Sequence, residues 1–264
     1  MISVLISVFN EDKYIKSSIE SLVIACNNAC GNNYEIIVVN DNSNDKCSKI
    51  LNNICNKYSQ IIVINNEVNL GLPSSLNKAF DKAKNKIIAR MDADDICEPN
   101  RFVKQLNYLI DNPNIDILGS NASLINMNSD KIGKTNMPLI HDNIIKRLEF
   151  NNPMIHPSII MKSKVLKQLG GYDEKLMRAQ DLDLWHRASR NGFKFSNIND
   201  SLIRYRVNQN PPIKTLILSF SVEFKNALIN RSLKGAIYSF LVLLKNLLTK
   251  YNIYTPKALK NNKQ

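Results

Sequence analysis

The stretch KIIARMDADDICEP, residues 86–99, runs from a short apolar segment directly into three carboxylates within four positions. Asp92, Asp94 and Asp95 repel one another, because neighbouring carboxylates disfavour joint ionisation. A hard divalent cation such as Mg²⁺ or Mn²⁺ offsets this charge and leaves coordination positions for substrate phosphates. A solvated acidic turn, with an aspartate capping the next helix, is the alternative interpretation of the same residues.

The apolar residues before the aspartates, Ile87, Ile88 and Ala89 with Met91, predict a buried strand. The acidic cluster then follows the carboxyl end of that strand, where open α/β sheets bind their ligands. This position favours a metal-assisted phosphate site.

Further strands are predicted upstream, at residues 2–9, 34–39 and 61–64, and an amphipathic helical pattern follows each of them. Strands that alternate with helices imply right-handed crossovers and a parallel sheet. The predicted fold class is therefore α/β, with a mostly parallel sheet and helices on both faces. The loops after the strands gather at one edge, which places Asn10, Asp41, Gly71 and the acidic cluster around one cleft.

Two common phosphate-binding motifs are absent from the sequence. No GxGxxG follows the first strand, and no GxxxxGK[ST] occurs anywhere. We therefore expect phosphate to be bound through a metal ion.

The net charge of +12 is concentrated near the carboxyl terminus. Residues 202–264 carry eleven Lys or Arg against one acid, or +10, whereas residues 1–201 carry 24 against 22, or +2. A basic C-terminal segment on a nearly neutral body indicates an anionic surface such as a membrane, and no nucleic-acid groove.

Five cysteines occur without a CxxC pair or a histidine at zinc spacing, which predicts reduced thiols in a cytoplasmic protein. No basic leader with an apolar core precedes the first strand, so we expect no secretion.

The second half gives weaker signals. Residues 115–118 and 159–161 predict strands, and polar residues 126–138 predict a loop. Asp181 begins an amphipathic helix, where a carboxylate is favoured by the helix dipole alone. Trp185, one turn later, suits the core or an acceptor-stacking wall, and Asp183 a solvated or structural carboxylate.

Several motifs occur together in one order. They are Phe9-Asn10-Glu11, EIIVVNDNSND (35–45), NLGL (69–72), IARMDADD (88–95) with Pro99 and Arg101, NPMIHPS (152–158), GGYDE (170–174) and QDLDLW (180–185). Over roughly residues 1–207 the chain resembles the inverting family 2 glycosyltransferases of the GT-A fold, of the bacterial surface-polysaccharide type.

The resemblance implies residue roles. Asp41 would contact uracil, Asp92 would lie near the ribose, and Asp94 would bind the Mn²⁺ or Mg²⁺ that bridges the diphosphate. Asp181 would be the catalytic base. Asn40 and Gln180 stand where the family usually has Asp and Glu. The implied nucleotide-binding residues are Phe9, Asn10, Glu11, Asp41, Asn69, Gly71, Arg90, Asp92 and Ala93, and the acceptor-side residues are His156, Gln180 and Trp185.

The implied reaction moves a sugar, galactose or glucose, from a UDP-sugar to a glycan or lipid-linked oligosaccharide acceptor and forms a β-glycosidic bond. The alternative is a non-catalytic, membrane-docked module that binds nucleotide sugars. Residues 1–210 are expected to form the catalytic domain, with a nucleotide-sugar half (1–120) and an acceptor half (121–210). Residues 211–264 are expected to form a basic amphipathic helical extension.

Helices are predicted in this extension over residues 213–254. Its longest uncharged run, residues 235–244, is only ten residues, whereas a spanning helix needs about 20. We expect it to lie on the inner face of the cytoplasmic membrane; the alternative is a helical hairpin packed on the catalytic domain or on a second subunit of a homodimer. The predicted apolar face is Ile237, Phe240, Leu241, Leu244, Leu248 and Tyr251, flanked by Arg231, Lys234, Lys245 and Lys250.

Overall fold

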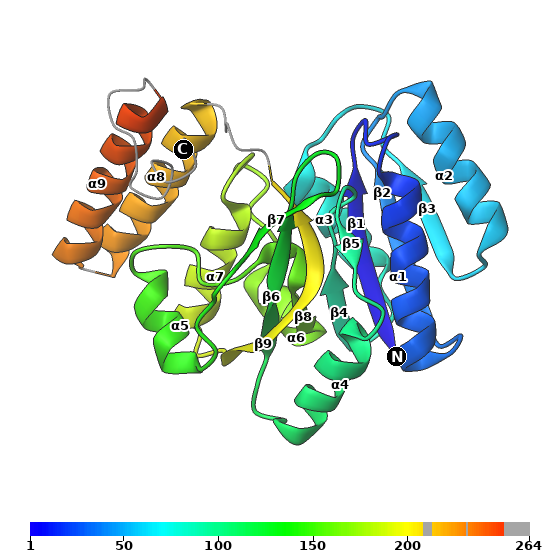
Figure 1. Cartoon of the computed structure of the whole chain (residues 1–264). Coiled ribbons are helices and arrows are strands. Elements are labelled where there is room, and N and C mark those ends of the chain that lie inside the picture. Colours follow the sequence, from blue (N-terminus) through cyan, green and yellow to red (C-terminus); the bar gives the residue numbers. More distant parts are fainter. Residues whose placement is uncertain (208–212, 231, 251–264) are drawn as a thin grey trace.

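A computed structural model describes residues 1–207, 213–230 and 232–250 of the chain. Within these residues the strands form one mixed sheet in the order β3-β2-β1-β4-β8-β6-β9-β5, and β7 pairs with β6 outside this path (Figure 1). The sheet is continuous through both expected halves, since the expected boundary at residues 120 and 121 falls inside β6.

The first half has the predicted β-α alternation. Parallel pairing joins β3 to β2, β2 to β1 and β1 to β4. Asn44 caps α2, because its side chain accepts a hydrogen bond from the Cys47 backbone N–H. The elements are β1 (Ile2–Val8), α1 (Ile15–Cys30), β2 (Tyr34–Asn40), α2 (Asp45–Lys57), β3 (Ile61–Asn65), α3 (Leu72–Lys82), β4 (Ile87–Arg90), β5 (Ile96–Cys97) and α4 (Arg101–Asp111).

The second half introduces antiparallel pairs, which the sequence did not indicate. β8 (Ile160–Lys162) is antiparallel to both β4 and β6 (Ile117–Ile125), whereas β9 (Phe195–Arg206) is parallel to β6 and antiparallel to β5. The sheet is thus parallel from β3 to β4 and mixed beyond.

The prediction of a loop over residues 126–138 was wrong in part. Lys131–Lys134 form β7, an antiparallel partner of β6. Its side chains are largely exposed, so the segment lacks the apolar alternation by which strands are recognised. β6 itself extends well past the predicted residues 115–118, because its buried polar residues are satisfied by hydrogen bonds: Asn121, for example, bonds to Thr135 and Asn199.

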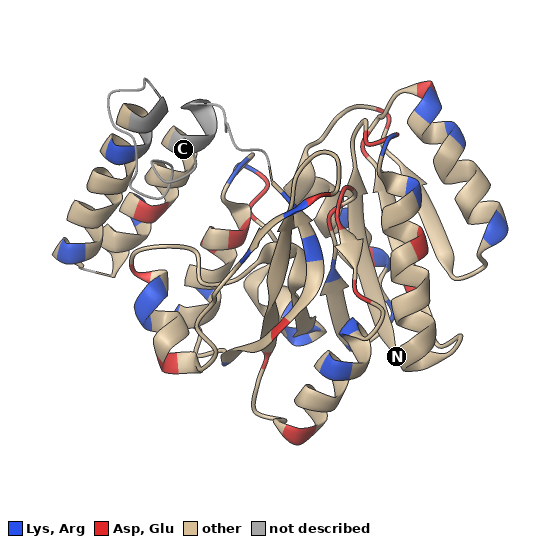
Figure 2. Cartoon of the chain, viewed as in Figure 1, with Lys and Arg blue, Asp and Glu red and all other residues tan. Residues whose placement is uncertain are grey.

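Helices cover both faces of the sheet, as predicted. Alternate residues of β1 divide between two cores: Val4 and Ile6 lie on the face of α1, α2 and α4, and Leu5 lies on the other face. That second face packs against α3, α5 (His141–Leu148), α6 (Ser163–Leu169) and α7 (Gln180–Arg190). The loops that follow the strands carry much of the acidic charge (Figure 2).

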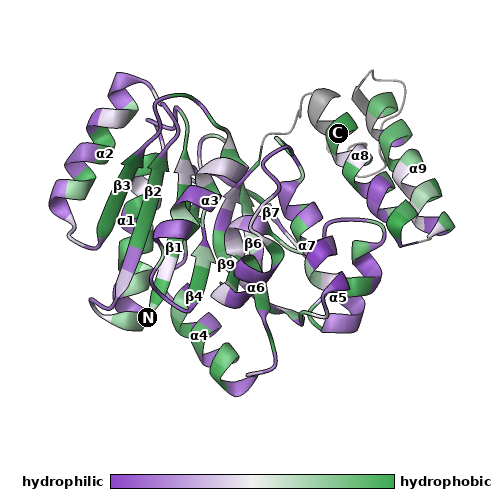
Figure 3. Ribbon diagram, turned by 180° about the vertical axis from the view of Figure 1, so that it is seen from behind, coloured by the Kyte–Doolittle hydropathy of each residue, from purple (hydrophilic) through white to green (hydrophobic). Residues whose placement is uncertain are grey.

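The C-terminal segment forms two helices, α8 (Ile213–Ile229) and α9 (Leu233–Lys250), which lie side by side at the end of the molecule far from α2 (Figures 1 and 3). α8 also packs against α7. No helix in the described residues is long and apolar enough to span a bilayer. Arg231, Tyr251 and the predicted helical residues 251–254 lie outside the described residues.

Candidate active site

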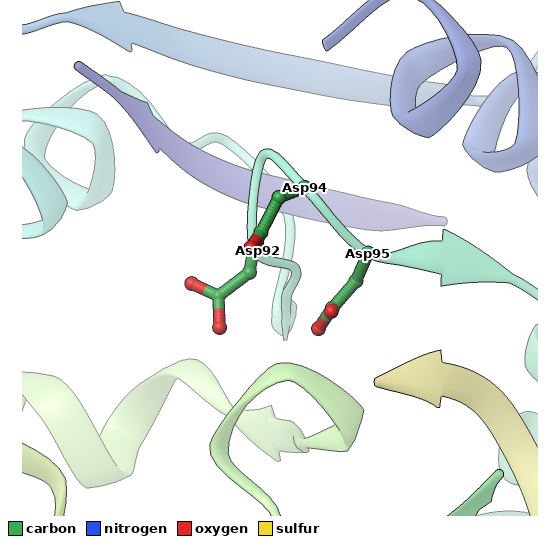
Figure 4. A group of neighbouring side chains, drawn as sticks. All are labelled: Asp92, Asp94 and Asp95. Carbon is green, nitrogen blue, oxygen red and sulfur yellow. The ribbon is translucent and has the colours of Figure 1, made fainter. Parts of the chain in front are cut away.

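The acidic cluster lies on the turn between β4 and β5. Figure 4 shows Asp92, Asp94 and Asp95 on this turn, with the carboxylates of Asp92 and Asp95 directed to the same side. One carboxylate oxygen from each aspartate lies within 4.8 Å of the others. At this spacing the three negative charges repel one another when all three carboxylates are ionised.

The positive charge near the turn does not offset the negative charge of these carboxylates and the cost of burying them, so the pKa values of Asp94, Asp95 and Glu11 are raised. Burial, followed by the charge of Asp92, raises the pKa of Asp94 to about 6. Burial, followed by Asp94 and Asp92, raises the pKa of Glu11 to about 7. The pKa of Asp95 is also raised, first by burial, and its Oδ2 atom is buried without a hydrogen-bond partner among the described residues. Hard oxygen donors with excess negative charge fit a divalent cation such as Mg²⁺ or Mn²⁺.

Two arginines brace this turn. Arg90, buried at the end of β4, donates a hydrogen bond to the Asp92 carboxylate. Arg206, at the end of β9, donates its backbone N–H to Asp95 Oδ1 at 2.7 Å and its Nε–H to the Asp94 carbonyl at 3.0 Å. Sequence reasoning missed Arg206, because no local pattern connects it to a turn more than a hundred residues away.

Asp41 follows β2 and is buried, and both oxygens of its carboxylate accept hydrogen bonds from the protein. Its two oxygens accept hydrogen bonds from the backbone N–H groups of Leu70 and Gly71, both at 2.8 Å, and from Asn66 Nδ2 at 2.7 Å. A carboxylate has about four lone-pair positions, so one acceptor position is left for a ligand. Asp41 therefore shapes the loop at residues 66–71, and it also lines the cavity described next.

A cavity of about 760 Å³ joins these elements. Most of the predicted site residues line it: Phe9, Glu11, Asp41, Asn69, Gly71, Arg90, Asp92, Ala93, Asp94, His156, Gln180 and Asp181. The residues that sequence reasoning did not identify are Ser7, Leu72, Pro157, Met177, Arg178, Ala179, Tyr205 and Leu218. Three of these, Met177, Arg178 and Ala179, belong to the segment just before α7.

Asp181 lies in the first turn of α7 and is partly exposed to the cavity. Asn152 Nδ2 donates a hydrogen bond to its Oδ2 at 2.6 Å. Burial raises the pKa of Asp181, while the bond from Asn152 opposes the rise. A carboxylate with a raised pKa that faces a cavity is suited to accept a proton at neutral pH.

Two predicted site residues do not line the cavity. Trp185 is fully buried, with its ring edge-on to His156 and Phe195, so the prediction of a core position is confirmed and the alternative of an acceptor-stacking wall is wrong. This side of α7 faces the sheet, which the helical period alone did not reveal. Asn10 points away to the start of α2, where its side chain accepts the Asn44 N–H at 2.8 Å and its own N–H donates to Ser43 Oγ.

His156 lies at the cavity wall, and its Nε2 is 2.9 Å from the Tyr172 hydroxyl. Burial, followed by the charge of Arg90, lowers its pKa well below the ordinary value, so the ring is neutral. Asp183 is also buried, where it pairs with Arg187 at 2.7 Å, which makes it structural.

The acidic turn at the carboxyl end of β4 and the helix-borne carboxylate in the same cavity are the arrangement expected of a GT-A glycosyltransferase. Residues 3–170 match the family described as Glycosyl transferase family 2, and the chain belongs to that family.

The relatives agree with this assignment. The chain is 40% identical over 210 residues to an uncharacterised glycosyltransferase of Methanocaldococcus jannaschii, covering 78% of this chain and 71% of the relative. It is 30% identical to the O-antigen biosynthesis glycosyltransferase WbnJ of Escherichia coli, covering 82% and 84%. The fold is similar to S. aureus TarS 1-349 in complex with UDP-GlcNAc, with a TM-score of 0.68 at 18% identity over all of this chain and 76% of that one.

Proposed function

We propose that this glycosyltransferase is an inverting enzyme that moves a sugar from a UDP-sugar to a hydroxyl of a glycan or lipid-linked oligosaccharide, forming a β-glycosidic bond. The observation that carries the proposal is that Asp181 and the acidic turn line one cavity. Relatives named for O-antigen and amylovoran biosynthesis support a surface polysaccharide as the product. The proposed sugars are galactose and glucose.

The positions of the side chains support the proposed roles. Asp41 has one acceptor position left for the N–H of a uracil ring, which would select UDP. Asp181 takes the proton of the acceptor hydroxyl as that oxygen attacks the anomeric carbon and the bond to UDP breaks. General base catalysis of this kind contributes on the order of 10²- to 10⁴-fold. A single displacement inverts the configuration, so an α-linked donor gives a β-glycoside.

Asp94 would hold Mn²⁺ or Mg²⁺, with Asp92 near the ribose, and the raised pKa values around the turn support this assignment. When bound, such a cation neutralises negative charge on the departing diphosphate. A mannosyltransferase of Pyrobaculum calidifontis with a similar fold, at a TM-score of 0.66 and 14% identity, is in complex with GDP-Man and Mn²⁺.

Release of UDP in the absence of any acceptor tests the proposal. UDP-galactose, UDP-glucose and UDP-GlcNAc are incubated with the protein and Mn²⁺, with GDP-mannose as the control for base selectivity. Slow release that EDTA abolishes is expected. Tight UDP binding measured by calorimetry, with no release from any donor, would instead support the non-catalytic binding module.

We also propose that the pair of helices α8 and α9 docks on the inner face of the cytoplasmic membrane. Four residues of the predicted apolar face, Ile237, Phe240, Leu241 and Leu244, are exposed on α9. Hydrophobic residues cover much of both helices (Figure 3). Lys234 and Lys245 lie on the same helix and would attract anionic lipid. A homodimer contact through this face is the competing possibility.

A further inference from the structure

A second cavity, of about 690 Å³, lies beside the first. Asp181 and Ala179 line both cavities, and no carboxylate of the acidic turn lines the second. The remaining walls come from the segment after α5, from α7 and from the two C-terminal helices. Besides Ala179, the lining residues outside α7 are Asn151, Asn152, Ser219, Phe220, Glu223, Tyr238, Ser239, Leu241, Val242, Leu243 and Lys245.

The position of Asp181 between the two cavities matters for an inverting displacement. The attacking hydroxyl must approach the anomeric carbon from the side opposite the departing diphosphate, and the base must reach that hydroxyl. With the diphosphate at the acidic turn in the first cavity, the second cavity supplies a separate space that also reaches Asp181.

We propose that the second cavity binds the acceptor as a sugar residue, and that α8 and α9 form one wall of this acceptor site, with Glu223 and Tyr238 as specificity-determining contacts. This inference rests on the proposed function. It adds that the C-terminal helices belong to the active site as well as to a docking surface.

The chemistry of the lining suits an uncharged sugar ring. Amide, hydroxyl and carboxyl groups from Asn151, Ser219 and Glu223 offer hydrogen bonds, and the rings of Phe220 and Tyr238 offer flat apolar surfaces. Burial raises the pKa of Glu223 to about 7. Near neutral pH this side chain is partly protonated and can both donate to and accept from a neutral hydroxyl.

The two helices are fixed against the catalytic domain, as a binding wall requires. The Tyr238 ring packs edge-on against Phe150, with ring centroids 5.3 Å apart. At Gly235 a Cβ atom would lie 3.1 Å from the Glu149 carbonyl oxygen, so α9 approaches the end of α5 closely. Asn226 of α8 accepts a hydrogen bond from Arg190 of α7 at 2.8 Å.

The experiment compares Glu223→Ala and Tyr238→Ala with Ser221→Ala. Ser221 is exposed on α8 two residues from Glu223, and its hydroxyl donates to the Ile217 carbonyl one turn earlier, so its replacement is a matched control. The probes are the methyl β-glycosides of glucose, galactose and N-acetylglucosamine, titrated at saturating UDP-sugar and Mn²⁺. Transfer to each probe, UDP release without a probe, and UDP affinity are measured for every variant.

Loss of one or two acceptor contacts is expected to raise the KM for the methyl glycoside by about 2- to 10-fold per variant. UDP affinity and acceptor-independent release should stay at the wild-type level in both variants, because neither residue lines the first cavity. Ser221→Ala should leave all three quantities unchanged.

Three outcomes would overturn the inference. One is an unchanged KM in both variants, and another is a parallel loss of UDP affinity. The third applies if the wild-type protein releases UDP but transfers to no probe. In that case the inference is overturned if the glycosides, with UDP present, do not protect residues 217–245 from hydrogen exchange. A wild-type protein that releases no UDP from any donor contradicts the proposed function itself.

Discussion

Asp94 and Asp181 line the same cavity but act on different partners. Replacing Asp94 should therefore impair UDP binding, and replacing Asp181 should impair turnover. Asp94→Asn should weaken Mn²⁺-dependent UDP binding, since a ligand of the cation is lost. Asp181→Asn should keep UDP binding and lower turnover by about 10²- to 10⁴-fold, since a base acts on the acceptor and not on the nucleotide. Calorimetry and UDP release on both variants measure the two effects. Equal loss of UDP affinity would contradict the assigned roles.

The pH dependence of turnover should depend on Asn152. Burial raises the pKa of Asp181 and the hydrogen bond from Asn152 opposes the rise. A general base works only when ionised, so kcat should fall as the pH drops through this pKa. Asn152→Ala removes the bond that favours the ionised form, and the acidic limb should therefore move to higher pH.

The pH profile of kcat for UDP release, recorded for the wild type and Asn152→Ala, measures this shift. Asn112→Ala, at a residue that lines neither cavity, serves as the control and should keep the wild-type limb. An Asn152→Ala profile that coincides with the wild type would show that another group sets the limb.

At the level of elements, the loop between β3 and α3 is shaped by Gly71. Its φ of +84° is a left-handed conformation, and an added Cβ atom would lie 2.8 Å from Met177 Cε. Gly71→Ala should lower the free energy of unfolding by about 1–3 kcal/mol because of this backbone strain and contact. Urea denaturation is the measurement.

Two further variants test the cause of that loss. Adding Met177→Ala to Gly71→Ala should restore only the part of the stability that the contact removes, since the backbone strain stays. Gly133→Ala is the control, because its Cβ would meet only a side-chain atom at 3.7 Å. A loss at Gly133 as large as at Gly71 would contradict the explanation.

The pair α8 and α9 should bind anionic vesicles through its exposed apolar face. The double variant Ile237→Ser, Phe240→Ser removes two side chains that are 53% and 56% exposed and do not line the second cavity. Co-sedimentation with phosphatidylglycerol vesicles should fall in this variant, and wild-type binding should weaken with salt because the lysine contribution is screened.

Ile110→Ser on α4, where the side chain is 74% exposed, is the control for general surface hydrophobicity. If the double variant sediments with vesicles at the wild-type level, the exposed apolar face of α9 does not bind the membrane, and a contact with a second subunit is favoured.

At the level of the whole molecule, Arg101 joins the two halves of the sheet. Its guanidinium is fully buried and donates hydrogen bonds to the carbonyls of Arg90, at the end of β4, and of Ile159, just before β8. Arg101→Lys should lower the free energy of unfolding by about 2–4 kcal/mol, because an ammonium group cannot reproduce the planar fork of donors. Urea denaturation monitored by circular dichroism measures this loss.

Arg204→Lys is the matched control, since Arg204 is exposed and pairs with Glu98 at the surface. Its replacement should change the stability by less than about 1 kcal/mol. A similar loss of stability in both variants would indicate that the loss in Arg101→Lys is not caused by the burial of this side chain.

Features that depend on neighbouring residues could be predicted from the sequence alone. The β-α order of the first half and the acidic turn after β4 both follow from local periodicity and from charges a few positions apart. The C-terminal helices and the exposed apolar residues of α9 also follow from a 3.6-residue period. The ordered set of motifs added the glycosyltransferase family.

Contacts between groups far apart in the sequence could be seen only in the folded protein. Arg206 reaches Asp95 across more than a hundred residues, Trp185 turns to the core, and the polar strand β7 forms because β6 offers it an edge. The second cavity exists because α8 and α9 pack beside Asp181. These contacts are set by which faces are buried together, and burial is a property of the assembled layers that no short stretch of sequence contains.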